Sequence, residues 1–285
     1  NNFNNLIFFI KKRFLRLYPL HILTLIFFVF FNLFKIYLLT KNNMEANHGV
    51  YNFFDFLKNI FLLHGFSGSS FNLPSWSISV EFYTYLVFGL LLLTKLFFRM
   101  TIPIIVLASL VIYFQSTGYI AKDYMNLTRC LFCFFLGCLA YEHRNTFAIA
   151  EYSEILFLIS SFVSILSIVL FKQFIFLLAP PLFLIVILSA FHLNKLSSVY
   201  KVLTLKFFVF LGSISYGIYM IHFCITIPLR HVLHFIFGYK IDENGFLLLG
   251  NLQGFIFYIL IFFLCLLLSF LSFKYLESKW KIKKI

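Results

Sequence analysis

The sequence predicts an all-α fold, a polytopic transmembrane helical bundle of about eight spans, and three observations support this prediction. Of the 285 residues, 62% are hydrophobic and 12% are charged, whereas soluble domains average about 25% charged residues. The apolar residues form long uninterrupted runs, and about 20 such residues cross a bilayer as a helix. A β-barrel would instead show alternation. These features exclude a water-soluble globular fold and a disordered chain.

Eight apolar runs are predicted to span the membrane: residues 17–39, 76–94, 101–117, 127–142, 154–171, 173–193, 207–228 and 251–273. The fourth run is short, and the fifth and sixth are separated only by Lys172 and Gln173. Pro180-Pro181 in the sixth run predicts a kink or a break, because proline removes a helix hydrogen bond. We expect residues 1–285 to form a single membrane domain, with one long connection at about 40–75.

The basic residues predict the orientation of the chain in the membrane. Of the 23 lysines and arginines, 15 lie on one set of alternate connections and 8 on the other. Because cytoplasmic loops carry an excess of Lys and Arg, both termini are expected in the cytoplasm and the 40–75 connection on the outer face. Its amphipathic stretch, Asn52 to Phe66, is expected to lie in the interface beside membrane lipid. Topology thus accounts for the net charge of +13, and nucleic acid is not an expected partner.

Glu81 is the first candidate functional residue, because an ionisable group inside a membrane span is costly. At spacings of four residues, Ser77, Glu81 and Tyr85 share one face of a helix. Such a face is suited to a hydroxylated acceptor, which Glu81 would orient or deprotonate. The alternative is a carboxylate that extends to the outer interface, with Trp76 as part of an aromatic belt.

A second polar stripe lies in the span at 207–228. Ser215, Tyr219 and His222 recur at one helical face and are suited to line a substrate cavity. The alternative is structural hydrogen bonding between helices. Small residues that would allow close helix packing accompany the stripe: Gly212, Ser213 and Gly217.

Arg13 and Arg16 form the third candidate group, three residues apart on one helical face. Arginines so placed can hold phosphates by bidentate hydrogen bonds, which suits a nucleotide-like donor such as coenzyme A. The alternative is ordinary anchoring at the cytoplasmic surface. The chain has no zinc-ligand spacing or glycine-rich phosphate loop, so no metal is expected.

These three segments, in this order and spacing, resemble the acyltransferase-3 family of bacterial multi-pass membrane acyltransferases. The matching elements are Arg13-x-x-Arg16 before Tyr18-Pro19, Trp76-Ser77 with Glu81 and Tyr85, Ser215-Tyr216 with Tyr219 and His222, the stretch Arg129 to Gly137, and the closing Lys274 to Trp280. The resemblance covers essentially the whole chain.

The resemblance implies transfer of an acyl group, usually acetyl from acetyl-CoA, to a cell-surface carbohydrate such as lipopolysaccharide. It implies O-acetylation at the bacterial inner membrane, with acyl-CoA as a co-substrate rather than a bound cofactor. The acceptor is a surface polysaccharide or a lipid-linked sugar. Its implied site residues are Glu81 and His222 for catalysis, Arg13 and Arg16 for the donor, and Trp76, Ser77, Tyr85, Ser215 and Tyr219 for the acceptor.

The sequence departs from the family pattern in one respect. The family's proposed catalytic histidine lies in the first span, eleven residues after a basic residue, and none of the 8 histidines here fits that spacing. The family typically has about ten spans. We therefore expect an N-terminally truncated member without that histidine. The alternatives are a transporter or flippase for a sugar or lipid-linked solute, gated at Pro180-Pro181, and a non-catalytic membrane subunit.

Overall fold

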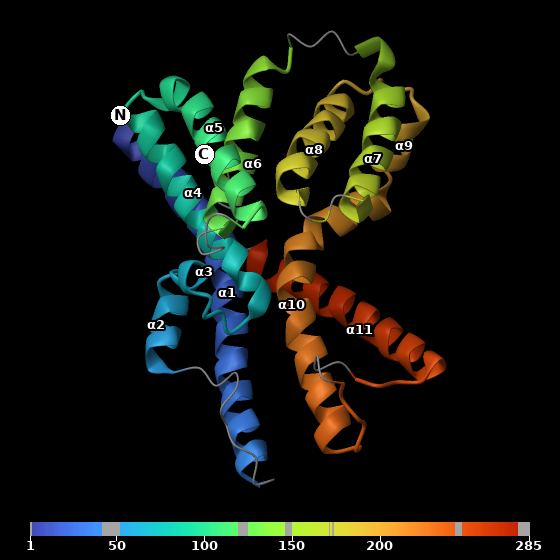
Figure 1. Cartoon of the computed structure of the whole chain (residues 1–285). Coiled ribbons are helices and arrows are strands. Elements are labelled where there is room, and N and C mark those ends of the chain that lie inside the picture. The colour runs from blue at the N-terminus through green and yellow to red at the C-terminus, as the bar shows by residue number, and fades with distance from the viewer. Residues whose placement is uncertain are drawn as a thin grey trace. The chain divides into compact units, whose positions relative to one another are not determined.

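A computed structural model describes residues 2–41, 52–118, 125–145, 150–170, 172, 174–242 and 247–278 (Figure 1). Its regular secondary structure within these ranges is helical, apart from an isolated β-bridge between Ile241 and Leu247. The all-α prediction is therefore confirmed.

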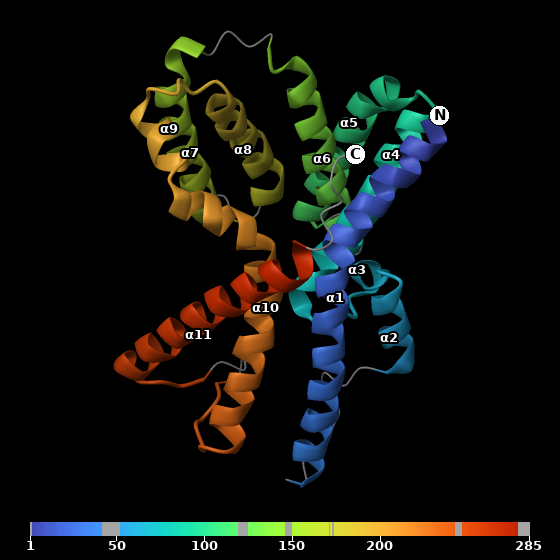
Figure 2. The same cartoon turned by 180° about the vertical axis from the view of Figure 1, so that it is seen from behind.

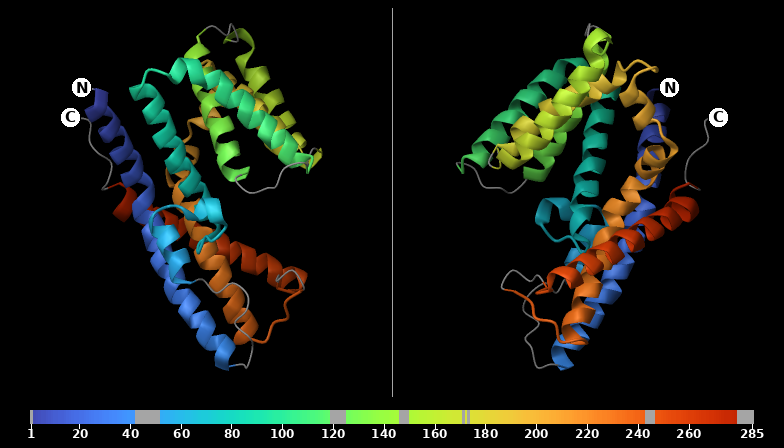
Figure 3. Two further views of the ribbon diagram at one scale, coloured as in Figure 1. Left: turned by 60° about the vertical axis from the view of Figure 1, so that its left-hand side comes forward. Right: turned by 90° about the vertical axis from the view of Figure 1, so that its right-hand side faces the viewer.

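The elements, in chain order, are α1 (Asn2–Lys41), α2 (Phe53–Ile60), α3 (His64–Ser67), η1 (Leu73–Ser75), α4 (Trp76–Leu93), α5 (Phe97–Ser116), α6 (Met125–His143), η2 (Ala150–Tyr152), α7 (Ser153–Leu170), α8 (Ile175–Phe191), α9 (Ser198–Leu203), α10 (Lys206–Phe235), α11 (Asn251–Ser272) and η3 (Phe273–Glu277). The longest of these, α1, is continuous over 40 residues and passes through Pro19 (Figure 3).

Six stretches among the described residues are long and apolar enough to cross a membrane: Phe3–Tyr37, Leu73–Leu93, Phe97–Ser116, Ser153–Leu170, Lys206–Phe235 and Asn251–Glu277. The other two predicted spans correspond to α6, which carries Arg129, and to α8, an apolar helix of 17 residues. The chain is therefore a multi-pass membrane protein. Its helices group into two compact units, residues 1–10 with 80–210 and residues 11–79 with 211–285.

In the first unit, α5 packs against α6 and α7 against α8 (Figures 1 and 2). Ala108 and Ile112 of α5 and Phe132 of α6 form a buried apolar cluster. Of the kink or break predicted at Pro180-Pro181, the break is wrong, because α8 continues through both prolines. Each proline removes one donor from the backbone, and the remaining hydrogen bonds keep this short helix intact.

In the second unit, the buried residues Leu25, Phe28 and Phe71 form a cluster between α1 and the segment before η1. The close packing predicted at Gly217 is confirmed. A Cβ added there would lie 3.1 Å from the Cβ of Ser269 on α11, tighter than ordinary van der Waals contact. Gly212 has open space around its Cβ position, so this glycine does not mark a close helix contact.

In the connection at about 40–75, the amphipathic stretch forms the helices α2 and α3. Asn52 and Asp55 form a capping box at the start of α2, each side chain accepting a hydrogen bond from the other's backbone N–H. The short α3 ends at Gly68, whose φ of 68° is the left-handed conformation that favours glycine. Residues 42–51 of the predicted connection lie outside the described residues.

Candidate functional site

Two histidines lie stacked in the interior of the second unit. The rings of His21 on α1 and His64 on α3 are 5.2 Å apart between centroids and within 5° of parallel. Their side chains are 1% and 0% exposed. Nε2–H of His21 donates to the Asn59 carbonyl at 2.9 Å, and Nε2–H of His64 donates to the Ser75 carbonyl at 3.0 Å. In the neutral form, each ring therefore donates through Nε2 and has its lone pair on Nδ1.

Sequence reasoning gave no role to either histidine. His21 does not follow a basic residue by eleven positions, so the family spacing does not select it, although the cost of burying ionisable groups in a span points to it directly. The Asn59 side chain completes the surrounding network, since its Nδ2 donates to the Asp55 and Ser69 carbonyls at 2.8 and 2.7 Å. These contacts fix α2 and α3 against α1.

We expect the fold to lose stability at acid pH through His64. Burial lowers the pKa of His64 below its ordinary value of 6.5, so the unfolded chain binds the proton more readily than the folded chain. Stability is therefore complete above pH 6.5 and falls as the pH drops below it. Thermal unfolding of the protein in detergent between pH 8 and 5 would measure this. His64→Gln should flatten this decline in stability with falling pH, whereas His143→Gln, an exposed control, should not. An equal decline in the unmodified protein and both variants would contradict the assignment to His64.

The predicted acceptor residues Ser77 and Tyr219 meet at one backbone group. The hydroxyls of Ser77 and Tyr219 both donate to the Pro74 carbonyl, each at 3.0 Å. A second bond ties the same segments, because Asn72 Nδ2 donates to the Met220 carbonyl at 2.9 Å. The start of α4 and the polar stripe of α10 thus lie side by side, 145 residues apart in sequence.

The other members of the α10 stripe have local partners. Nδ1–H of His222 donates to the Ile218 carbonyl at 3.2 Å, which leaves Nε2 as the lone-pair nitrogen. The exposed Ser215 donates to the Gly212 carbonyl at 2.9 Å. The Tyr216 hydroxyl donates to the Leu17 carbonyl of α1 at 2.6 Å, so α10 is also fixed to α1. Trp76 is partly buried where α4 begins.

Glu81 and Tyr85 form a hydrogen-bonded pair in the first unit. The Tyr85 hydroxyl donates to Glu81 Oε1. The Tyr85 ring is buried edge-on against Phe9 and Phe134, with centroids 5.9 and 5.7 Å away. The carboxylate is partly buried. A phenol fixed by aromatic packing therefore orients a carboxylate inside a membrane span.

The arginines differ in their surroundings. Arg13 is partly buried and Arg16 exposed on α1, both on the face predicted for phosphate binding. On α6, the Arg129 guanidinium lies 3.8 Å from the centroid of the Phe176 ring and donates to Asn126 Oδ1. Lys279 and Trp280 of the closing motif lie outside the described residues. No group of three metal-ligating side chains occurs in the part of the chain that the structure describes.

The fold and these polar groups define a multi-pass membrane protein with a carboxylate, hydroxyls and imidazoles among its apolar helices. A family model described as an acyltransferase domain, Acyl_transf_3, matches residues 2–274. The chain belongs to this family, and the resemblance drawn from the motifs is confirmed. Membership supports acyl transfer to an acceptor as its activity. No curated protein and no solved structure matches the chain.

Proposed function

We propose that the protein transfers an acyl group, acetyl in the simplest case, from a coenzyme A thioester to a hydroxyl of a surface polysaccharide or lipid-linked sugar at the bacterial inner membrane. The observation that supports this most is the Glu81–Tyr85 pair inside a span. A carboxylate held at that depth by a phenol is suited to proton transfer rather than to anchoring.

The reaction needs a base for the acceptor hydroxyl. The hydroxyl oxygen attacks the thioester carbonyl carbon, the C–S bond breaks, and coenzyme A leaves as a thiolate that takes up a proton. Glu81 accepts the hydroxyl proton while the Tyr85 phenol holds its carboxylate in place. His222 is a second base of suitable tautomer, since Nε2 carries its lone pair. Both assignments follow from the chemistry of these groups.

The remaining residues have binding roles in this proposal. The hydroxyls of Ser77 and Tyr219, already aligned on the Pro74 carbonyl, provide hydrogen bonds for a sugar. Ser215 adds an exposed hydroxyl, and Trp76 an aromatic surface. Arg13 and Arg16 hold the donor phosphates.

The decisive experiment uses the full chain in proteoliposomes with acetyl-labelled acetyl-CoA and a polysaccharide acceptor. We expect free thiol and labelled carbohydrate to form in equal amounts. Movement of a sugar across the vesicle membrane with no thiol release would favour the transporter alternative. That alternative placed a gating break at Pro180-Pro181, and α8 is continuous there.

We expect Arg13→Gln and Arg16→Gln each to raise the KM for acetyl-CoA by about tenfold, because a hydrogen bond to a charged group contributes roughly 1.5 kcal/mol or more. The kcat should change little, since phosphate contacts bind ground state and transition state alike. Thiol release at varied acetyl-CoA concentration measures both constants. Lys11→Gln, on the opposite face of α1, is the matched control. An unchanged KM in both arginine variants would exclude these residues as the phosphate site.

A further inference from the structure

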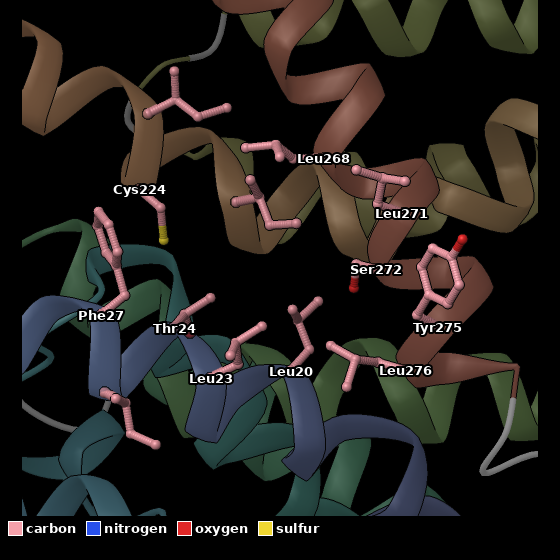
Figure 4. A pocket seen from close by; sticks show the side chains of 13 residues that line it. Leu20, Leu23, Thr24, Phe27, Cys224, Leu268, Leu271, Ser272, Tyr275 and Leu276 are labelled. Carbon is pink, nitrogen blue, oxygen red and sulfur yellow. The ribbon is translucent and has the colours of Figure 1, made fainter.

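A pocket of about 600 Å³ lies in the second unit between α1, α10, α11 and η3 (Figure 4). This volume falls among those of sites for small organic molecules, about 300–1,000 Å³. Leu20, Leu23 and Phe27 line it from α1, Cys224 from α10, and Leu268 from α11. Its wall is therefore mainly hydrocarbon.

The two ends of the pocket are lined by different residues. Figure 4 shows Leu20, Leu276 and Tyr275 toward one end and Phe27 with Cys224 toward the other. Leu20 and Phe27 are seven residues apart on α1, or about 10 Å at 1.5 Å per residue. A segment of a straight hydrocarbon chain fits this length.

Three polar side chains along the pocket, those of Thr24, Cys224 and Ser272, already donate to groups within the protein. The Thr24 hydroxyl donates to the His21 carbonyl at 2.9 Å, and the Cys224 thiol to the Met220 carbonyl at 3.8 Å. An occupant with amide groups, such as the pantetheine arm of coenzyme A, would lose its hydrogen bonds to water without replacement. A hydrocarbon chain has no such cost.

Basic groups lie at the Leu20 end. The Lys274 ammonium is 5.3 Å from the centroid of the Tyr275 ring, which lines the pocket. Arg16 precedes Leu20 by one helical turn on the same face of α1. One carboxylate, Glu277, is also at this end and accepts from the Ser272 hydroxyl at 3.3 Å. Lys274, which has no part in the proposed acyl transfer, suits a phosphate at the mouth of this apolar pocket.

We propose that this pocket binds one acyl chain of an anionic phospholipid from the membrane, with the lipid phosphate beside Lys274. Several wall residues are exposed, Leu23 by 50% and Leu268 by 40%, so a lipid reaches the pocket without opening the protein. This binding is independent of the proposed acyl transfer.

A phosphatidylglycerol with a photoactivatable diazirine in its acyl chain tests the proposal on the full chain in nanodiscs. Mass spectrometry of the cross-linked peptides is expected to map the label to pocket residues of α1, α10 and α11. The same probe with a phosphatidylcholine headgroup should label these peptides at least fivefold less. Label spread evenly over the spans, or equal labelling by both probes, would overturn the proposal and indicate ordinary boundary lipid.

Two variants sharpen the test. Leu268→Trp fills the pocket and Lys274→Gln removes the cation, and each should reduce labelling at least fivefold. Leu267→Trp, at a neighbouring exposed position that does not line the pocket, and Lys11→Gln should retain it. Retained labelling in Leu268→Trp and Lys274→Gln, or cross-links between two protein copies at this face, would contradict a lipid site. Because the mapping uses the unmodified chain, it decides the question even where a variant fails to fold.

Discussion

Acyl transfer is expected to fall at least 100-fold when Glu81 is replaced by glutamine, because a positioned general base contributes roughly 10²- to 10⁴-fold. Glutamine keeps the side-chain length, and its carbonyl still accepts the hydrogen bond from Tyr85. The variant therefore removes the proton acceptor and leaves the helix intact. Thiol release and labelled carbohydrate in proteoliposomes measure the loss.

Matched variants separate catalysis from a general effect of lost charge. Glu142→Gln removes an exposed carboxylate at the end of α6 and should leave transfer unchanged. Tyr85→Phe keeps the ring between Phe9 and Phe134 but removes the hydroxyl, so a smaller loss is expected. Normal transfer by well-expressed Glu81→Gln protein would remove Glu81 from the mechanism.

The largest expected loss of stability follows from Asn59→Ala. The Asn59 side chain is fully buried, donates to two carbonyls and accepts from the Phe71 N–H at 3.4 Å. At about 1 kcal/mol for each hydrogen bond, its removal should lower the free energy of unfolding by about 3 kcal/mol. Denaturant unfolding in detergent, followed by circular dichroism, measures this.

The controls for this prediction differ in which bonds they keep. Asn194→Ala removes an amide that accepts from the Leu196 N–H in an exposed turn, and it should cost under about 1 kcal/mol. Asn59→Asp keeps the acceptor for Phe71 and loses both donors, so its free energy of unfolding should also be lower than that of the unmodified protein. If Asn59→Ala is as stable as Asn194→Ala, the network around His21 does not hold α2 and α3 in place.

Much of the fold could be predicted from sequence, because the length of an apolar run decides whether a helix spans a bilayer. The runs at 154–171 and 251–273 agree with α7 and α11 to within a few residues. The pairing of Glu81 with Tyr85 was equally accessible, since both lie on one helix four residues apart. Local periodicity determines these features.

The contacts between distant segments could not be predicted in this way. Periodicity places Ser77 and Tyr219 each on a helix face, but it does not state that both reach the Pro74 carbonyl. The stacking of His21 on His64 depends on how α3 packs on α1. The continuity of α8 through Pro180-Pro181 likewise depends on the hydrogen bonds that remain around the prolines.

The bond from Tyr216 to the Leu17 carbonyl has a consequence for how the protein is made. It joins residues 199 positions apart, and Asn72 to Met220 joins residues 148 apart. At about 5–20 residues per second of synthesis, α1 enters the membrane about 10–40 s before α10 emerges from the ribosome. During that interval the insertion machinery or the lipid must shelter the face of α1 that α10 later covers. Biogenesis of this chain therefore depends on this face of α1 persisting uncovered by protein until α10 arrives.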